Sequence, residues 1–414
     1  MRIHIAAALL GCAAASTTTN CLAGELHLLG NVPYAYAESA SADGRVVAGQ
    51  DSFSYWYWTF DAWVQPVPGS VPAGNGVGGQ AGITDDGTVM TCSMQWDFNG
   101  VLKTEATLFN ITTYEAQSVG SFDGANCDAE RTGAWGLSAD GSTVVGLGWQ
   151  TGCQARAFRW RAATGVVDLG TLYFFKPTRA NACNANGNVI VGWNDDYSGY
   201  RQAAVWNNGV QQNLTAPGNV KLREAIAVSG DGVWVGGIGR ASLNNGAPWR
   251  WSQATGYQSL GPTPIDGTHS VTAFNHDGSK ALCYLGFAAA FGEGYIWIQD
   301  RGYVPLEQYA QEHGVTIPAD VHLALPLGIS ADEMTIVGTA RLPNGLDTSP
   351  FVLDLHPGGG SCPADLDNSG DVGGADIGML LGNWGGFGQG DLNGDGVVDG
   401  ADIGILLGAW GPCL

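Results

Sequence analysis

The sequence predicts an all-β protein, with a seven-bladed β-propeller-like repeat body and a small all-α module at its C-terminus. Three observations predict this: seven copies of one turn pattern, a composition suited to short strands, and a duplicated segment at the end of the chain. The predicted divisions are a signal peptide at 1–23, the seven-repeat domain at 24–355, a linker at 356–361 and the module at 362–414.

The repeats are marked by a turn of the Asp-Gly type, which supplies the positive φ of a two-residue hairpin. The turns recur at intervals of 43 to 55 residues, at Asp43-Gly44, Asp86-Gly87, Asp140-Gly141, Asn186-Gly187, Asp231-Gly232, Asp277-Gly278 and a variant, Asp332-Glu333. Each turn lies in a four-strand unit, whose clearest copy covers 136–149, 155–160 and 165–172. Seven such units fit a seven-bladed propeller.

The two ends of the body predict how the ring closes. Residues 25–30 have the pattern of a last strand with no blade before it, and residues 350–355 have that of a third strand with no successor. We therefore expect these segments to pair and complete one blade, which hides two strand edges. An open solenoid built from the same repeats is the alternative.

The longer sixth interval contains an insertion, residues 306–313. Leu306, Tyr309 and Ala310 recur at helical spacing there, which predicts a short helix. His313 and His322 lie near it, and we interpret both as surface or packing residues.

Composition excludes some classes of function. Charged residues make up only 13% of the 414, while 64 Gly and 15 Trp suit short strands, tight turns and aromatic packing. The net charge is −21, with 17 Lys and Arg against 38 Asp and Glu, which excludes a nucleic-acid partner because phosphates would be repelled.

The N-terminus has the pattern of an export signal. Arg2 precedes an apolar stretch from Ile3 to Ala15, and cleavage is expected after Cys21-Leu22-Ala23. A lipoprotein signal cut before Cys12 is the alternative. No second apolar run is long enough to span a membrane, so the protein is expected to be secreted, either extracellular or at a bacterial cell surface.

Seven cysteines remain after the signal, so at least one is unpaired. Cys92 and Cys283 take the place of a small Gly at the end of a second strand, and Cys183 replaces an inward aliphatic, so we expect all three to be buried free thiols. Cys127 and Cys153 fall in loops of one repeat and can pair.

The repeats resemble the extracellular HAF-type repeat family at Ala157-Phe158-Arg159-Trp160, Asp168-Leu169-Gly170-Thr171-Leu172 and Ile329-Ser330-Ala331-Asp332. The resemblance implies an extracellular propeller-like body and brings no defined activity. Cys92 and Cys183 depart from the pattern, so we expect blades two and four to be less regular.

The C-terminal segment changes composition: from 361 onward there are eight Asp and no Glu, Lys or Arg. Segments 365–385 and 391–411 match at 14 of 21 positions, and each opens with oxygen-bearing residues at alternate positions around a Gly, as in calcium loops. The predicted ligands are Asp365, Asp367, Ser369, the carbonyl of Asp371 and Asp376 in the first loop, and Asp391, Asn393, Asp395, the carbonyl of Val397, Asp399 and Asp402 in the second. Gly373 holds position 9 of the first loop, so that site is expected to be the weaker of the two.

Each loop is followed by an apolar pattern at i, i+3, i+4 and i+7, which predicts a helix with one buried face. The predicted face residues are Ile377, Leu380, Leu381 and Trp384, then Ile403, Leu406, Leu407 and Trp410. So small a core predicts that calcium supplies folding free energy. A disulfide between Cys362 and Cys413 would clasp the two ends.

The duplicated loop and helix, with Asp at position 12, resemble a type I dockerin over residues 362–413. The resemblance implies two calcium ions and docking or anchoring through a protein partner. Cohesin-binding dockerins usually carry polar residues at loop positions 10 and 11, whereas this chain has Gly374-Ala375 and Gly400-Ala401, so we expect a partner other than a standard cohesin. The Gly-Pro-Cys ending also resembles a terminal module of bacterial exported proteins, which implies a surface anchor.

Three functions are compatible with these features. The favoured one is a non-catalytic exported propeller that is displayed through its calcium module, with no catalytic or cofactor-binding residue assigned. A carbohydrate-active hydrolase or lyase in polysaccharide catabolism is the second, although residues such as Glu105, Glu130, Glu224 and Glu293 form no local motif. The third is a glycan- or protein-binding body that uses aromatics such as Tyr55, Trp56, Tyr57 and Trp58.

Overall fold

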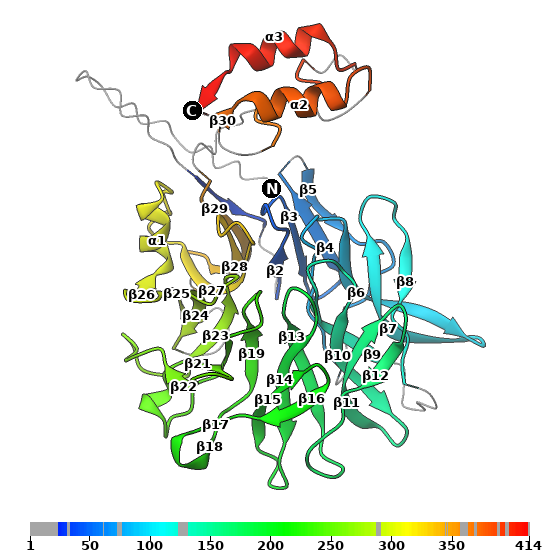
Figure 1. Ribbon diagram of the computed structural model, residues 1–414, viewed down its shortest axis with the longest axis vertical. Coiled ribbons are helices and arrows are strands. Elements are labelled where there is room, and N and C mark those ends of the chain that lie inside the picture. Colours follow the sequence, from blue (N-terminus) through cyan, green and yellow to red (C-terminus); the bar gives the residue numbers. More distant parts are fainter. Residues whose placement is uncertain are drawn as a thin grey trace. The chain divides into compact units, whose positions relative to one another are not determined.

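The computed structural model in Figure 1 describes most of the chain. The described residues exclude 1–23, 31–33, 61, 73–76, 123–130, 287–290, 344, 346, 357–362, 368–370, 387–389, 394–396 and 413–414. The predicted signal peptide therefore lies outside the described residues, and so does the predicted linker except for His356. Two compact units divide the chain, a body at Gly24–His356 and a module within Pro357–Leu414, and each is described by itself.

The body is a seven-bladed β-propeller (Figure 1). Five blades are four-stranded antiparallel sheets whose strands follow chain order. Blade one comprises β2 (Tyr36–Ala40), β3 (Val46–Gln50), β4 (Tyr55–Thr59) and β5 (Ala62–Pro66). Blade three comprises β9 (Thr132–Leu137), β10 (Val144–Gln150), β11 (Gln154–Arg161) and β12 (Gly165–Asp168), and blade four comprises β13 (Thr178–Cys183), β14 (Val189–Asp195), β15 (Arg201–Asn207) and β16 (Val210–Asn213).

The remaining regular blades follow the same order. Blade five comprises β19 (Ala225–Val228), β20 (Val235–Gly237), β21 (Trp249–Ser252) and β22 (Gly256–Ser259). Blade six comprises β23 (Ser270–Phe274), β24 (Lys280–Leu285), β25 (Glu293–Ile298) and β26 (Gly302–Pro305). A two-stranded ribbon, β17 (Thr215–Ala216) with β18 (Val220–Lys221), links blades four and five.

Blade seven closes the ring with strands from both ends of the body. Its sheet order is β1 (Glu25–Leu28), β29 (Thr348–Asp354), β28 (Thr335–Arg341) and β27 (His322–Ile329). Leu26 pairs with Leu353 and Leu28 with Phe351, in antiparallel register. The predicted pairing of 25–30 with 350–355 is confirmed, and the body is a closed ring rather than an open solenoid.

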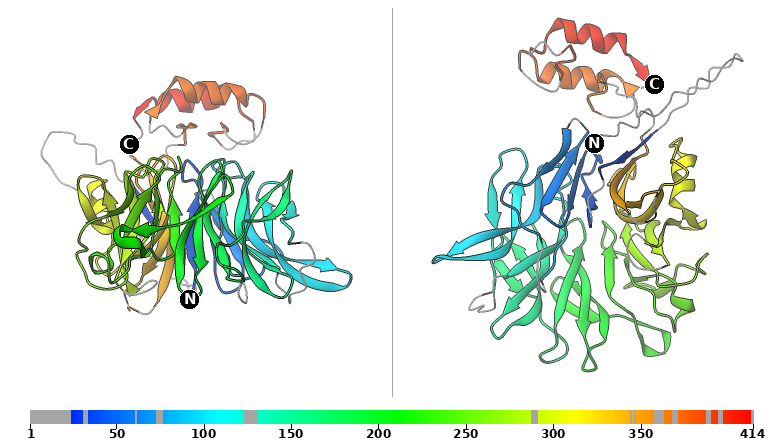
Figure 2. Two further views of the ribbon diagram at one scale, coloured as in Figure 1. Left: turned by 60° about the horizontal axis from the view of Figure 1, so that its bottom comes forward. Right: turned by 180° about the vertical axis from the view of Figure 1, so that it is seen from behind.

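Blade two is the irregular one. Its sheet has three strands, β6 (Val89–Phe98), β7 (Val101–Asn110) and β8 (Ala116–Ser118), and the place of a first strand is held by an isolated bridge between Ile83 and Met90. The β6–β7 hairpin projects from the ring (Figure 2). The expected irregularity is therefore confirmed for blade two and wrong for blade four, because Cys183 fits at the end of a regular β13.

The seven turns share one hydrogen bond, from a backbone amide to the side chain of the turn Asp or Asn. In the first, the Ser41 hydroxyl donates to Asp43 Oδ1 at 2.6 Å, and the amide of Arg45 donates to the same oxygen at 3.0 Å. Gly44 has a φ of +69°, which favours glycine. The amide bond recurs at the other six turns. The hydroxyl bond recurs at four of them, and the fourth and sixth turns have Asn184 and Asn275 in place of the hydroxyl residue. A local sequence therefore sets each hairpin.

The described cysteines bear out part of the predicted assignment. Cys92, Cys183 and Cys283 carry free thiols, Cys92 and Cys283 are buried and Cys183 is half-buried. Burial raises the pKa of the Cys183 thiol to about 12, so the thiol stays protonated at neutral pH. Cys153 takes part in a disulfide. Its predicted partner Cys127 lies outside the described residues, as do Cys362 and Cys413, so both predicted pairings stay predictions.

The predicted insertion helix is confirmed as α1 (Leu306–Glu312), which packs beside β25 and β27. Leu306, Tyr309 and Ala310 are its buried residues, as predicted. The module contains β30 (Asp371–Val372), α2 (Gly374–Gly382), α3 (Gly400–Gly408) and β31 (Gly411–Pro412). Among the described residues, no helix combines the length and apolarity needed to cross a membrane.

Candidate functional site

The first loop of the module gathers three of its predicted ligands. Asp365, Asp367 and Asp376 each offer a carboxylate oxygen, and these oxygens lie within 4.8 Å of one another. Asp371, whose carbonyl was predicted to face the ion, lies at the start of β30. Ser369 lies outside the described residues. A divalent cation with oxygen ligands would match this donor set.

The second loop places its predicted ligands at the same positions relative to its helix, and Asp395 lies outside the described residues. Asp391, Asn393, Val397 and Asp399 lie ahead of α3 and Asp402 lies in its first turn. The Asp399 side chain caps α3 by accepting the amide of Ala401 at 2.8 Å. The corresponding position in the first loop is Gly373, which has no side chain to cap or ligate with.

An aspartate at position 12 holds each loop closed. Asp376 Oδ1 accepts the amides of Leu366 at 2.7 Å and Asp367 at 3.0 Å, and its Oδ2 accepts the amide of Gly373 at 2.6 Å. The Asp376 side chain therefore binds backbone amides at positions 2 and 3 of its own loop and at position 9.

Asp402 repeats these bonds with the amides of Leu392, Asn393 and Asp399, at 2.8, 3.1 and 2.8 Å. The hydrogen bond from Asp399, followed by those from Asn393 and Leu392, lowers the pKa of Asp402 against an opposing effect of burial. Both position 12 side chains are buried, and each accepts three backbone amides of its own loop.

Backbone hydrogen bonds join the two halves of the module. Val372, at position 8 of the first loop, pairs with Gly411 after α3. Val398, at position 8 of the second loop, donates to Gly386 O at 3.0 Å and accepts from the Gly385 amide at 2.9 Å, after α2. The chain end that precedes Cys413 is thus fixed to the first loop.

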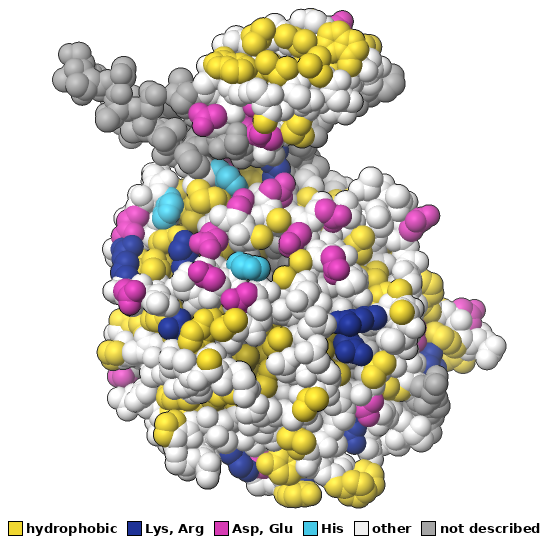
Figure 3. Space-filling view, viewed as in Figure 1, with side chains coloured by type: hydrophobic (Ala, Val, Ile, Leu, Met, Phe, Trp, Pro, Cys, Tyr) yellow, Lys and Arg dark blue, Asp and Glu magenta, His cyan; other side chains and the backbone are white. Residues whose placement is uncertain are grey.

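The predicted buried helix face is only partly buried. Leu380 and Leu406 are fully buried with Val372 and Val398, and Ile377 and Ile403 pack against them. The other four predicted face residues are half-exposed: Leu381 at 50%, Trp384 at 51%, Leu407 at 52% and Trp410 at 55%. Both helices end before their Trp, and a core this small covers only one row of side chains. The module therefore presents an apolar surface, visible in Figure 3.

The body has a pocket on blade two of about 450 Å³. It is lined by Trp96, Asp97, Phe98, Glu105, Ser118, Gly120, Ser121, Phe122 and Arg131. Glu105 is a buried lining residue that pairs with Arg131 at 2.9 Å and accepts a hydrogen bond from the Ser118 hydroxyl. The Arg131 guanidinium lies 4.4 Å from the centre of the Phe98 ring. Sequence reasoning missed this pocket, because its residues come from three strands and a loop; the long second interval was the available signal.

Other residues considered from the sequence have structural roles. The aromatic run Tyr55 to Trp58 is buried in β4, so it packs the blades and offers no glycan-binding surface. Glu224 is buried and binds Arg179 at 2.5 Å and Arg201 at 3.3 Å, which neutralises its charge. His313 Nδ1 lies 2.8 Å from the carbonyl oxygen of Tyr309 at the end of α1. Glu130 lies outside the described residues.

No family model and no curated protein sequence matches this chain. Among solved structures, it is similar to the β-propeller domain of the Trilobed protease from Pyrococcus furiosus, with 12% identity, a TM-score of 0.50, and coverage of 78% of this chain and 96% of that one. An oligogalacturonate lyase in complex with manganese gives 12% identity and a TM-score of 0.51, with 80% and 92% coverage.

TolB from Acinetobacter baumannii gives 14% identity and a TM-score of 0.38, and the match spans 79% of this chain and 65% of TolB. The two matches with TM-scores of 0.50 and 0.51 show the fold alone, because their identity to this chain is only 12%. The Pyrococcus propeller is described as having an open velcro topology, whereas β1 and β29 close the ring here.

Proposed function

We propose that this chain is an exported calcium-binding protein whose dockerin-like module docks or anchors a non-catalytic propeller to a protein partner or surface anchor. The observation that carries the proposal is the pair of loops, each closed around a buried position 12 aspartate. Two such loops, 26 residues apart, repeat the same bonds, which favours a built ion site over chance acidity.

Charge balance supports calcium as the ion. The segment from 361 to the end has eight Asp and no Lys or Arg, so no basic side chain of the module can neutralise the carboxylates. Three of them converge within 4.8 Å in the first loop. A hard divalent cation relieves their repulsion and takes oxygen ligands at such loops.

The apolar surface of the module supports docking. Leu381, Trp384, Leu407 and Trp410 form two copies of one exposed pattern. The helical glycines Gly378 and Gly404 lie beside them with open space around them, so another backbone can approach closely. We propose an extracellular protein receptor as the occupant of this surface.

Calorimetry on the full chain tests the ion sites. We expect two calcium-binding events, with the tighter one abolished by Asp395→Ala, because it removes a position 5 carboxylate of the loop that has the fuller ligand set. Asp371→Ala is the matched control: it removes a carboxylate but keeps the predicted carbonyl ligand, so both events should remain. If a chelator left α2 and α3 fully helical by circular dichroism and no calcium bound, the proposal would be wrong.

Docking has its own test. A Trp384→Ala/Trp410→Ala double variant should bind two calcium ions as before and lose retention on the outer surface of the producing cells. Trp384 and Trp410 contribute no calcium ligand, so a loss of calcium binding in this variant would contradict the assignment of the exposed face. Unchanged retention would reject that face as the docking surface.

A second candidate function, glycan binding by the body, is favoured by the blade two pocket. Aromatic walls of Trp96, Phe98 and Phe122 with a buried Glu105–Arg131 pair can stack on sugar rings and hydrogen-bond their hydroxyls. Retention of the full chain on polysaccharide gels should fall with Trp96→Ala and stay unchanged with Trp384→Ala. Turnover of the polysaccharide would instead indicate a carbohydrate-active enzyme. The lyase match gives this chain no catalytic residue, because it is a likeness of fold.

A further inference from the structure

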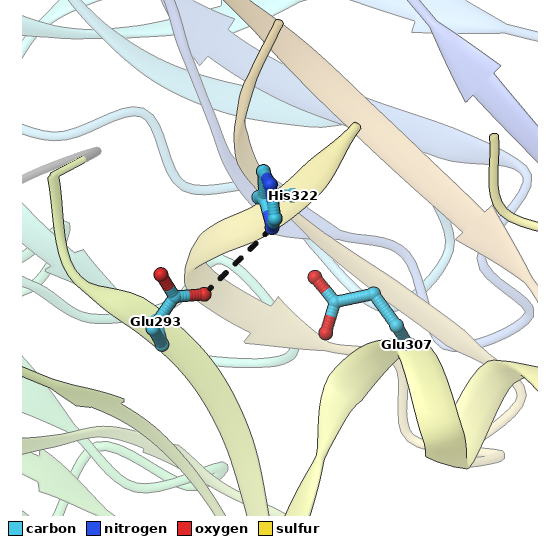
Figure 4. A group of neighbouring side chains, drawn as sticks. All are labelled: Glu293, Glu307 and His322. Atoms are coloured by element: carbon cyan, nitrogen blue, oxygen red, sulfur yellow. Dashed lines mark ion pairs between the residues drawn. The ribbon is translucent and has the colours of Figure 1, made fainter. Parts of the chain in front are cut away.

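Three side chains from different elements converge where blades six and seven meet the insertion. Glu293 begins β25, Glu307 lies in the first turn of α1, and His322 begins β27. One potential ligand atom from each lies within 4.8 Å of the other two, and His322 Nδ1 is 3.9 Å from Glu293 Oε2. Figure 4 shows the three side chains pointing toward one another.

We propose that Glu293, Glu307 and His322 form a binding site for a divalent transition metal of the zinc class, separate from the calcium loops. One imidazole nitrogen and two carboxylate oxygens are a donor set that zinc accepts, with bonds of about 2.0–2.2 Å. Adjacent ligands of a tetrahedral ion at that bond length lie about 3.4 Å apart. The three ligand atoms lie within 4.8 Å of one another, so small side-chain rotations would bring them to that separation. A water molecule can supply the fourth ligand.

Each carboxylate is oriented by one oxygen and offers the other. Glu293 Oε1 is held by Arg341 at 2.9 Å, which leaves Oε2 on the side of His322. Glu307 Oε1 accepts the Leu323 amide at 2.8 Å. Such outer bonds fix the direction of a metal ligand before the ion arrives. The site is therefore more ordered than three unrelated surface side chains.

The local charge also favours a cation. Among the described residues, Arg341 pairs with Glu293 at 2.9 Å, and the cluster itself contains two carboxylates, those of Glu293 and Glu307. A bound divalent ion would offset this excess of negative charge. The ion would also join the inserted helix α1 to β25 of blade six and β27 of blade seven.

Zinc titration of the full chain tests the site. The protein is first saturated with calcium and kept in excess calcium, so that the loops are filled, and zinc is then added in a calorimeter. We expect one zinc site, weakened roughly tenfold or more by His322→Ala and by Glu307→Gln. His313→Ala is the matched control, because His313 lies at the end of the same helix but outside the cluster, and it should bind as the wild type does.

A melting measurement guards against misfolded variants. Without zinc, the calcium-loaded His322→Ala and Glu307→Gln variants should melt within about 2 °C of the wild type, because the amide oxygen of the introduced glutamine still accepts the Leu323 amide and His322 is half-exposed. Zinc should then raise the melting temperature of the wild type and of His313→Ala only. Equal zinc binding by all four proteins would mean an adventitious ion only, and no binding by the wild type would reject the site.

Discussion

At the residue scale, a glycine stands six positions after the turn residue in five of the seven blades, and a close backbone contact explains it. A Cβ built on Gly146 would lie 2.0 Å from the carbonyl oxygen of Gly133, and one on Gly192 would lie 2.0 Å from that of Arg179. The first strand bulges beside this position in blades one and three to six, which brings its carbonyl toward the second strand. Contact with the neighbouring strand therefore favours glycine at positions such as Gly146 and Gly192, whereas blade six accommodates Cys283 at the same place.

Gly146→Ala should accordingly destabilise the body by about 1–3 kcal/mol, because the methyl group forces β9 and β10 apart. Denaturant unfolding followed by tryptophan fluorescence measures the loss. Cys283→Ala is the control at the same repeat position in blade six, where a Cβ already fits, and it should cost about 1 kcal/mol or less. Equal losses in both variants would contradict the steric explanation.

His356, at the end of the body, gives a dependence of stability on pH. Burial lowers the pKa of His356, but hydrogen bonds to Asp332 at 3.1 Å and Asp354 at 2.5 Å outweigh it and raise the pKa to about 9. The folded pKa thus exceeds the unfolded value of about 6.5. The stabilisation is fully present below about pH 6.5 and is lost as the pH rises through 9.

Between pH 6.5 and 9.5 the wild type should lose about 2–3 kcal/mol of unfolding free energy that His356→Gln does not lose. Denaturant unfolding at four pH values would measure the difference. His313→Gln should follow the wild-type curve. Parallel curves for the wild type and His356→Gln would show that the two carboxylates do not hold the charged imidazole.

Glu333 shows where residue-level prediction stops. The sequence marks it as the residue that replaces glycine in the seventh turn, and the structure places it at a φ of +66°. Its carboxylate accepts from Asn275 Nδ2 at 2.7 Å and pairs with Lys280 at 2.6 Å, which joins blade seven to blade six. Both partners lie more than 50 residues away in the sequence, so no local pattern contains this role.

At the scale of elements, local patterns predict what is built locally. The hairpin turns, the insertion helix and the two module helices follow from residues that lie only a few positions apart in the sequence. The same patterns predict too much burial in the module, because a periodic apolar face shows what a helix can bury and not how much partner surface exists. Leu380 and Leu406 find a core, while Leu381 and Leu407 do not. The blade two pocket and the Glu293–Glu307–His322 cluster depend on contacts between elements.

The helical glycines of the module give a prediction at this scale. Gly378 and Gly404 lie in the middle of α2 and α3, are exposed, and would meet nothing within 4 Å if given a Cβ. Gly378→Ala and Gly404→Ala should each stabilise the calcium-loaded module by about 0.5–1 kcal/mol, because alanine loses less backbone entropy in a helix. Chemical unfolding monitored by circular dichroism tests this.

Gly385→Ala is the matched control for these helical variants. Gly385 has a φ of +73°, so a side chain there is strained even though the space is open, and the variant should be destabilised. If docking uses the small-residue face, the two stabilised helical variants should also bind their partner more weakly. A stabilised variant with unchanged cell-surface retention would separate the helix effect from the docking proposal.

At the scale of the whole molecule, the turns join the blades into one ring. Backbone amides of one turn donate to the carbonyl of a neighbouring turn, as in Ala42 to Asp85 at 2.9 Å, Asp85 to Ala139 at 2.8 Å and Asp332 to Ala42 at 3.0 Å. The last of these joins blade seven to blade one. Each blade thus depends on its neighbours, and opening one junction exposes surface in two blades.

Removal of the closing strand β1 tests how much the ring depends on its closure. A variant whose chain begins at residue 31 loses β1, which leaves β29 with an unpaired edge and uncovers the core beside Leu26. We expect a loss of about 3 kcal/mol or more in unfolding free energy, together with concentration-dependent aggregation. A variant that begins at Glu25 keeps the strand and should behave as the full chain does. Equal melting temperatures and equal solubility for the two variants would mean that the ring is held without its closing strand, because the turn contacts alone would then suffice.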